Sequence, residues 1–181
     1  MARHSDFMKR ELFLPEGANV YAILDGAAIP ALLVQLHGEQ APAHFECLLP
    51  GTLTPDMLEV APYLVQLEPD APFTDWLLEA GWGQHWGIFA LSPLDFQSVR
   101  YHFRSLVRVY DEAGKRYLFF RYYDPRVLRI FLPTCREHQL AEMFGPVDLY
   151  LAESESATEL LSYRLEEGAL AAGKVVVPAA G

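Results

Sequence analysis

Residues 121–126 (RYYDPR) bring three charged side chains and two phenols together in a mostly apolar chain. Such clusters occur at catalytic and phosphate-binding sites, but structural ion pairs gather the same residue types. Asp124 directly before Pro125 favours a helix start, because aspartate is a good N-cap acceptor and proline suits the first helical turn. Arg121 has apolar neighbours, so if it is buried it needs a carboxylate partner such as Asp124. We therefore interpret the cluster as a strand-to-helix junction rather than a catalytic set.

The outer part of this cluster is the part that we would test for partner binding. Tyr122 and Tyr123 lie on opposite faces if the strand continues that far, so one phenol is expected in the core and the other at the surface. Arg126 and Arg129 lie near one face of the following helix, where we expect them to reach solvent. The exposed phenol together with Arg126 is the candidate partner-binding half.

A second candidate is His85, in the glycine-rich segment of residues 81–87 (GWGQHWG). This segment lacks the lysine of a phosphate-binding loop. We expect a tight turn in which Trp82 and Trp86 pack on the core. In that turn His85 is expected to be half-buried and hydrogen-bonded to backbone rather than a general base.

Asp25 is a third candidate, because it ends an apolar stretch, as carboxylates of many α/β enzymes do. It precedes a glycine, however, and Asp-Gly is also ordinary turn chemistry, which we favour. A small enzyme that uses His85 with Asp25 or Asp124, near Arg104 and Arg121, is the alternative.

Motifs of other enzyme classes give no support. No two of the six histidines stand at the helical spacing of zinc ligands, and no serine lies in a G-x-S-x-G pattern. Cys47 and Cys135 lie in apolar segments, where a thiol is usually inert packing. We predict no catalytic residue, no metal ligand and no cofactor, and therefore not an enzyme.

Composition limits the classes of partner. The chain of 181 residues holds 24 acidic and 14 basic residues, a formal net charge of -10, which disfavours binding to nucleic acid or to an anionic membrane. No apolar run approaches the roughly 20 residues of a membrane span, and the charged N-terminal residues do not form an export signal. Two widely separated cysteines fit a reducing compartment. We therefore expect a cytoplasmic protein.

Apolar stretches between turn signals predict the secondary structure. Strands are expected within residues 19–27, 44–52, 62–70 and 85–92, and helices within 29–39, 54–61 and 71–82. A helix follows whose buried face is Phe96, Val99, Phe103 and Leu106, since these recur every three or four residues. We then expect a β-hairpin around residues 111–115 (DEAGK), helices within 124–133 and 136–145, and strands within 147–153 and 159–167.

The order of these elements predicts the fold class. Strands and helices alternate over roughly the first hundred residues, which favours an α/β fold with a mixed β-sheet flanked by helices. The length suits a single domain. We assign residues 1–18 to an N-terminal extension, 19–167 to the domain, and 168–181, rich in small residues, to a flexible C-terminal tail.

The succession YAILDGA, LLPGT, APYLVQL, GWGQHWGIFALSP, HFRSLVRV, FRYYDPRVL and FGPV resembles the domain-of-unknown-function 4123 family. The resemblance covers residues 20–147. The combination of HWGIFALS with FRYYDPRVL at this distance is its most specific part. Positions that match the recurrent motifs, expected to hold the fold or shape a docking surface, are Asp25, Gly26, Pro62, Tyr63, His85, Trp86, Arg104, Arg121, Tyr123, Asp124, Pro125 and Arg126.

This resemblance implies a function and partners that the residues alone do not. Members of that family act in bacterial type VI secretion as adaptors, or chaperones, that load a toxic effector onto the spike, and they have no established catalytic residues. The implied partners are an effector and the trimeric valine-glycine-repeat (VgrG) spike protein, met in the cytoplasm. A toxin-neutralising immunity protein is a further alternative.

Overall fold

The structure is a computed structural model that describes residues 2–111 and 114–179. The expected hairpin turn includes Glu112 and Ala113, which lie outside the described residues, as do the last two residues of the expected tail. The elements are α1 (Ala2–Phe13), β1 (Asn19–Asp25), α2 (Leu32–His37), β2 (Phe45–Cys47), α3 (Pro55–Val60), β3 (Pro62–Leu67), α4 (Pro72–Gly81), β4 (Gly87–Ser92), α5 (Phe96–Leu106), β5 (Arg108–Asp111), β6 (Arg116–Phe119), α6 (Pro125–Phe131), the short 3-10 helix η1 (Leu132–Thr134), α7 (Glu137–Phe144), β7 (Leu149–Glu153), β8 (Glu159–Glu166) and β9 (Ala169–Val176).

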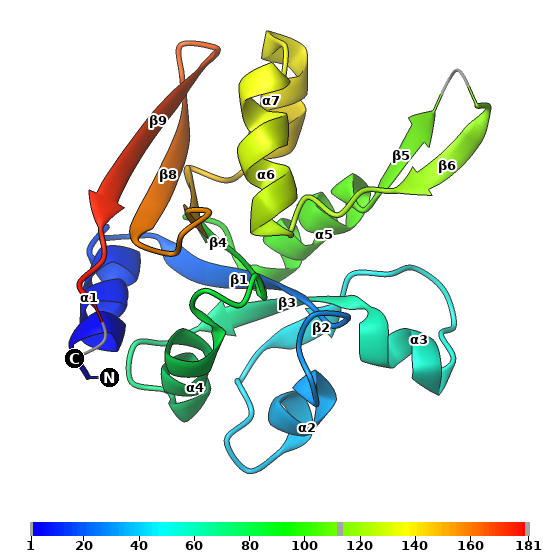
Figure 1. Ribbon diagram of the computed structural model, residues 1–181. Helices are drawn as coiled ribbons and strands as arrows, with labels where there is room; N and C mark the ends of the chain where they lie inside the picture. The colour runs from blue at the N-terminus through cyan, green and yellow to red at the C-terminus, as the bar shows by residue number, and fades with distance from the viewer. Residues whose placement is uncertain (1, 112–113, 180–181) are drawn as a thin grey trace.

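A seven-stranded sheet with the order β2-β3-β1-β4-β7-β8-β9 forms the centre of the fold (Figure 1). The predicted single α/β domain with helices flanking a sheet is confirmed, but every strand pairing described in the sheet is antiparallel. The strand-helix alternation does produce parallel strands, β1 with β2 and β3 with β4. Each parallel pair has an antiparallel strand inserted between its members, so the expected parallel neighbours never touch.

Helices cover both faces of this sheet (Figure 1). One face packs against α1, α2 and α4 through side chains such as Leu12, Leu36 and Leu77. The other face packs against α5, α6 and α7, which contribute Phe103 and Leu128 among others. β1 is buried by both layers, because successive side chains of a strand point to opposite faces.

Both terminal segments, as far as residues 2–179 describe them, belong to this fold. The segment assigned to an N-terminal extension contains α1, whose Met8 and Leu12 are fully buried against the core. The segment assigned to a flexible tail instead contains β9, which pairs along its whole length with β8. Glu167 and Gly168 both have positive φ, 50° and 81°, as a two-residue hairpin turn requires. Main-chain pairing with β8 therefore orders a segment that is rich in small residues.

The hairpin predicted around DEAGK is confirmed. β5 and β6 form a separate two-stranded antiparallel sheet that projects from the body of the molecule (Figure 1). The predicted apolar face of α5 is also confirmed, since Val99 and Phe103 are buried while Phe96 and Leu106 pack against the same core.

Candidate functional site

Two buried carboxylates end two strands at the same end of the sheet, with one strand between them. Asp25 is the last residue of β1 and Glu153 the last residue of β7, and they are only 1% and 5% exposed. The start of β4 lies between them, because Leu24 pairs with Gly87 and the register of β4 with β7 continues to the same level. Strand alternation places Asp25 on the face covered by α5, α6 and α7, and Glu153 on the face covered by α1 and α4.

Asp25 is held by Arg121. The Arg121 guanidinium donates from Nη2 to Oδ2 of Asp25, while the backbone N–H of Ala27 donates to Oδ1 at 3.1 Å. The same nitrogen of Arg121 lies 3.7 Å from Asp124 Oδ2. The hydrogen bond to Asp25 raises the pKa of Arg121. Arg121 therefore has the expected carboxylate partner. It hydrogen-bonds to Asp25 and makes a longer ion pair with Asp124.

Asp124 is the N-cap of α6, as predicted. Its Oδ1 accepts the backbone N–H of Arg126 at 2.9 Å, and Pro125 occupies the first turn. The Arg126 side chain also donates to both carboxylate oxygens, from Nε at 3.0 Å and from Nη2 at 2.8 Å. Burial acts to raise the pKa of Asp124, but the hydrogen bonds from Arg126 outweigh it and hold that pKa below its ordinary value. The aspartate thus ties the strand exit to the helix start.

The expected division of the two tyrosines between core and surface is wrong. β6 ends at Phe119, and the chain then turns, with the Asp124 N–H donating to the Arg121 carbonyl at 3.0 Å. Tyr122 and Tyr123 are consequently both buried. Only the guanidinium groups at the two ends of the cluster reach the surface.

Burial also sets the hydrogen bonding and acidity of these phenols. The Tyr122 hydroxyl donates to the Phe103 carbonyl on α5 at 2.9 Å, and its pKa lies well above the ordinary value. Burial raises the pKa of Tyr123 to about 12. Neither phenol is therefore available as an exposed partner-binding group.

Glu153 binds the glycine-rich loop on the other face of the sheet. It accepts the backbone N–H groups of Gly83 at 2.6 Å and of His85 at 3.0 Å. Nδ1 of His85 lies in ion-pair contact with Glu153 Oε1 but without the alignment of a hydrogen bond. The backbone of His85 has a positive φ of 58°, so the loop turns sharply around the carboxylate. The expected backbone partner of the His85 ring is thus replaced by a carboxylate.

Arg126 reaches solvent as expected, whereas Arg129 does so only in part. Arg126 has a side chain that is 52% exposed but remains bound to Asp124. Arg129 is half-buried, and its Nη1 donates to the Glu153 carbonyl at 3.0 Å, which links α6 to the end of β7. Three arginines, at residues 121, 126 and 129, therefore lie near three carboxylates, those of Asp25, Asp124 and Glu153.

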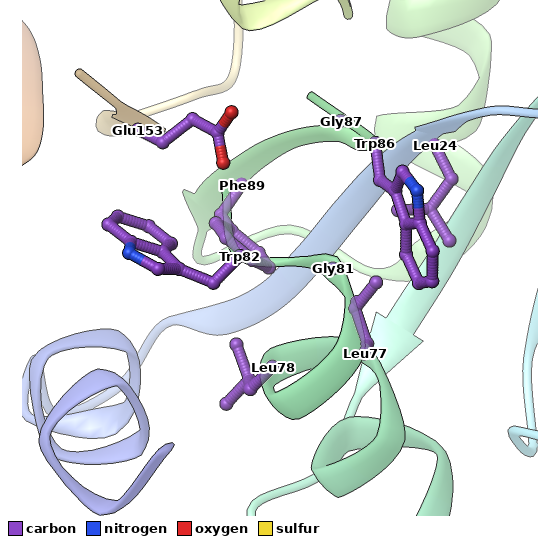
Figure 2. A pocket seen from close by; sticks show the side chains of 9 residues that line it. All are labelled: Leu24, Leu77, Leu78, Gly81, Trp82, Trp86, Gly87, Phe89 and Glu153. Carbon is purple, nitrogen blue, oxygen red and sulfur yellow. The ribbon is translucent and has the colours of Figure 1, made fainter. Parts of the chain in front are cut away.

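A small cavity lies between Glu153 and the tryptophans of the loop (Figure 2). Trp82 and Trp86 pack against the core as predicted, and Trp82 Nε1 donates to the Ala157 carbonyl at 2.7 Å. The cavity has a volume of about 20 Å³, room for roughly one water molecule. Small-molecule sites usually have about 300 Å³ or more, so this cavity is packing around the loop and not a substrate site.

Gly26, Pro62 and Tyr63 hold the turn that follows β1. The Gly26 N–H donates to the Ala61 carbonyl at 3.0 Å, and a Cβ on Gly26 would lie 2.8 Å from the Glu59 carbonyl oxygen and closer still to that of Ala61. Pro62 pairs with Asp25 in the sheet. The Tyr63 hydroxyl donates to the Leu58 carbonyl at 3.0 Å, which fixes the end of α3.

Arg104 lies apart from this cluster. Burial raises the pKa of the Cys47 thiol on β2, and the charge of Arg104 on α5 acts in the opposite direction. No ion pair among the described residues joins Arg104 to Asp25 or Asp124. His85 likewise contacts Glu153 and neither of those aspartates, so the alternative enzyme site is not assembled in this form.

Glu153 is the residue that the sequence interpretation missed. An acidic residue that ends an apolar strand (LYLAE) is the signal, the same one that singled out Asp25. Glu153 and Asp25 use their oxygens to accept hydrogen bonds from backbone or arginine, so these carboxylates stabilise a loop and a helix junction. Within residues 2–111 and 114–179, no group of three or more histidine, cysteine, aspartate or glutamate side chains is placed to hold a metal ion.

Comparison with known protein families shows to which family the chain belongs. The sequence model of the family described as Domain of unknown function (DUF4123) matches residues 20–142, more than half of the chain. The chain belongs to this DUF4123 family. Searches of the curated proteins and of the solved structures found no match. Among the described residues, no helix has the length and apolar character to cross a membrane.

Proposed function

We propose that this DUF4123 protein is a non-enzymatic adaptor, or chaperone, that binds a toxic effector of a bacterial type VI secretion system and helps load it onto the valine-glycine-repeat spike protein. Membership of the family carries the proposal, because adaptors of this kind are what the family resemblance implies. The proposed partners are the effector and the spike, and the proposed place of action is the cytoplasm.

The charged motif is consistent with a binding protein. Asp25, Asp124 and Glu153 each accept hydrogen bonds from backbone or arginine donors, and each lies at a junction between elements. Such a network stabilises the ends of the strands and the start of α6. The motif residues therefore support a rigid scaffold, which an adaptor requires to present its surfaces.

Two separate apolar surfaces are available for two partners. One is the β5–β6 hairpin, where Tyr110, Tyr117 and Phe119 are exposed. The other lies on α2 and α3, where Val34 and Val60 are exposed beside a hollow of about 500 Å³. In Figure 1 the hairpin projects at the upper right, whereas α2 and α3 lie in the lower part of the view. Exposed apolar groups that gather on a protein surface mark interaction sites, and an adaptor needs one site for each partner.

A co-purification experiment tests the proposal. The protein is co-expressed with the toxin encoded by the neighbouring gene, with and without the spike protein, and complexes are separated by size-exclusion chromatography. We expect a complex with the toxin, and we expect deletion of the adaptor gene to abolish toxin delivery. Absence of any complex together with unchanged delivery would falsify the proposal.

Two further measurements separate the alternatives. An immunity protein would inhibit the purified toxin directly and would protect cells that lack the spike. For the enzyme alternative, His85→Asn is the informative variant, because asparagine tolerates the positive φ at this position and a folded protein is expected. An adaptor with this substitution keeps its affinity for the toxin.

A further inference from the structure

The β5–β6 hairpin has an exposed aromatic face. Residues that pair directly across antiparallel strands share a face, so Tyr110 and Tyr117 lie together, and so do Arg108 and Phe119. Tyr110, Tyr117 and Phe119 are 53%, 64% and 67% exposed. The two tyrosine rings stand edge to face at 5.2 Å, and the Arg108 guanidinium lies 4.5 Å from the centre of the Tyr117 ring. This face is ordered by its own side chains and remains open to solvent.

The hairpin also has an open backbone edge. In the described structure β5 pairs with β6 alone, and a two-stranded sheet is marginally stable without further contacts. The Phe120 N–H donates to the Val107 carbonyl at 2.8 Å, and hydrogen-bonded pairs alternate with non-bonded pairs along an antiparallel ladder. Arg108 and Tyr110 therefore belong to non-bonded pairs, so their N–H and C=O groups point away from β6. These groups can bond a further strand.

A groove adjoins this open edge. Its volume is about 520 Å³, and three residues of β5 line it, together with residues of α5, α6 and α7. Its apolar lining includes Leu106, Phe120, Phe131 and Met143, and its polar lining includes Arg108, Gln139 and Glu142. No β6 strand residue lines it. The groove therefore combines backbone donors and acceptors along β5 with an apolar surface on α6 and α7.

We propose that an extended segment of the effector adds as a strand to the open edge of β5 and places alternate apolar side chains into this groove. The inference rests on the proposed adaptor function and names the site at which the effector binds. Strand addition of this kind derives affinity from main-chain hydrogen bonds and specificity from alternate side chains. A carboxylate of the segment would face Arg108.

The charge distribution favours an effector segment over a second copy of this chain. Residues 108–119 hold three basic residues against two acidic ones, whereas the whole chain has a net charge of -10. Two copies paired through β5 would bring together two bodies of the same strong negative charge and two Arg108 side chains. A partner segment that places one carboxylate at Arg108 complements the hairpin and brings neither a second body of the same charge nor a second Arg108.

Hydrogen exchange tests the open edge without any substitution. Amide exchange of the full chain is followed by NMR, alone and saturated with the toxin encoded by the neighbouring gene. We expect the amides of Arg108 and Tyr110 to exchange at least tenfold more slowly in the complex, since each gains an acceptor. The amides of Tyr117 and Phe119, on the outer edge of β6, are expected to change less. Unchanged exchange at Arg108 and Tyr110 in a formed complex overturns the inference.

A matched pair of variants tests the same point by affinity. Tyr110→Pro removes an N–H on the groove edge, and Tyr117→Pro removes the N–H of its cross-strand partner on the opposite edge. Both variants lose one ring of the same pair and keep the hydrogen bonds within the hairpin. We expect Tyr110→Pro to weaken toxin binding roughly tenfold or more, as loss of one or two hydrogen bonds implies, and Tyr117→Pro to weaken it clearly less.

The outcomes separate this inference from the proposed function. If the wild-type protein does not bind the toxin, the adaptor function fails and the inference fails with it. If the wild type binds and both proline variants bind equally well or equally poorly, the adaptor function stands and pairing at β5 is wrong. Dimerisation of the free protein that is lost in Tyr110→Pro alone would assign the edge to a second copy and also overturn the inference.

Discussion

Substitution of Asp124 separates two of its interactions, the cap of α6 and the ion pair with Arg126. Asp124→Ala removes both the N-cap of α6 and the ion pair with Arg126, whereas Asp124→Asn keeps a cap acceptor and removes the charge. Loss of a cap costs about 1 kcal/mol. The pair with Arg126 adds about 1 kcal/mol at most, because half of the arginine side chain is exposed to water. We therefore expect losses of about 2 kcal/mol for Ala and about 1 kcal/mol for Asn.

Urea unfolding followed by tryptophan fluorescence measures these losses. All three tryptophans, Trp76, Trp82 and Trp86, pack against the core and report on its unfolding. For a chain of this size, about 1 kcal/mol lowers Tm by roughly 2–4 °C, so the two variants should differ visibly in a thermal scan as well. If Asp124→Asn is as destabilising as Asp124→Ala, the cap is not the main contribution. If neither variant changes stability, the assignment of a junction role is wrong.

The pH dependence gives a second check on Asp124. Its pKa in the folded protein lies below the ordinary value, so its stabilising effect is present above the unfolded pKa of about 4 and is lost as the pH falls through the folded pKa. The wild type and Asp124→Asn should therefore converge in stability below about pH 4. A constant difference at all pH values would contradict the charge contribution.

Two further predictions concern packing and a half-buried histidine. Gly26→Ala should lower the free energy of unfolding by about 1–3 kcal/mol, because the added Cβ meets backbone carbonyls that cannot move aside. The control is Gly173→Ala, whose added Cβ meets only the Ser162 hydroxyl and which should be nearly neutral in the same urea assay. Burial lowers the pKa of His102, although the hydrogen bond to the Met143 carbonyl acts in the opposite direction. The unfolded chain therefore binds more protons than the folded protein below about pH 6.5, and the stability should fall as the pH drops under that value. His102→Gln should flatten this slope, and equal slopes would show that another group titrates.

Local chemistry made the junction predictable. Asp124 caps α6 and Pro125 occupies its first turn because both preferences depend on the few residues around a helix start. The hairpin at β5–β6 and the packing of the two loop tryptophans follow from equally local signals. The sequence could also require a carboxylate for Arg121, although it could not distinguish Asp25 from Asp124.

Several features depend on contacts between distant segments. The burial of Tyr122 and Tyr123 depends on where β6 ends, because the chain turns there and both side chains enter the core beside α5. β9 is ordered by main-chain hydrogen bonds to β8. The small side chains of this segment do not predict such pairing. Gly168, at a positive φ in the two-residue turn between β8 and β9, is the local signal for this hairpin.

The sequence by itself therefore determined most of the elements, the cap of α6 and the family, because propensity, capping and apolar periodicity act over a few residues. Only the tertiary structure decided which strands are neighbours, and so placed an antiparallel strand between each parallel pair. It alone brought Asp25 to Arg121 and Glu153 to the loop of His85, across separations of 96 and 68 residues. Strand order and ion pairing are set by the packing of whole layers, and that packing is not encoded in any short stretch of the chain.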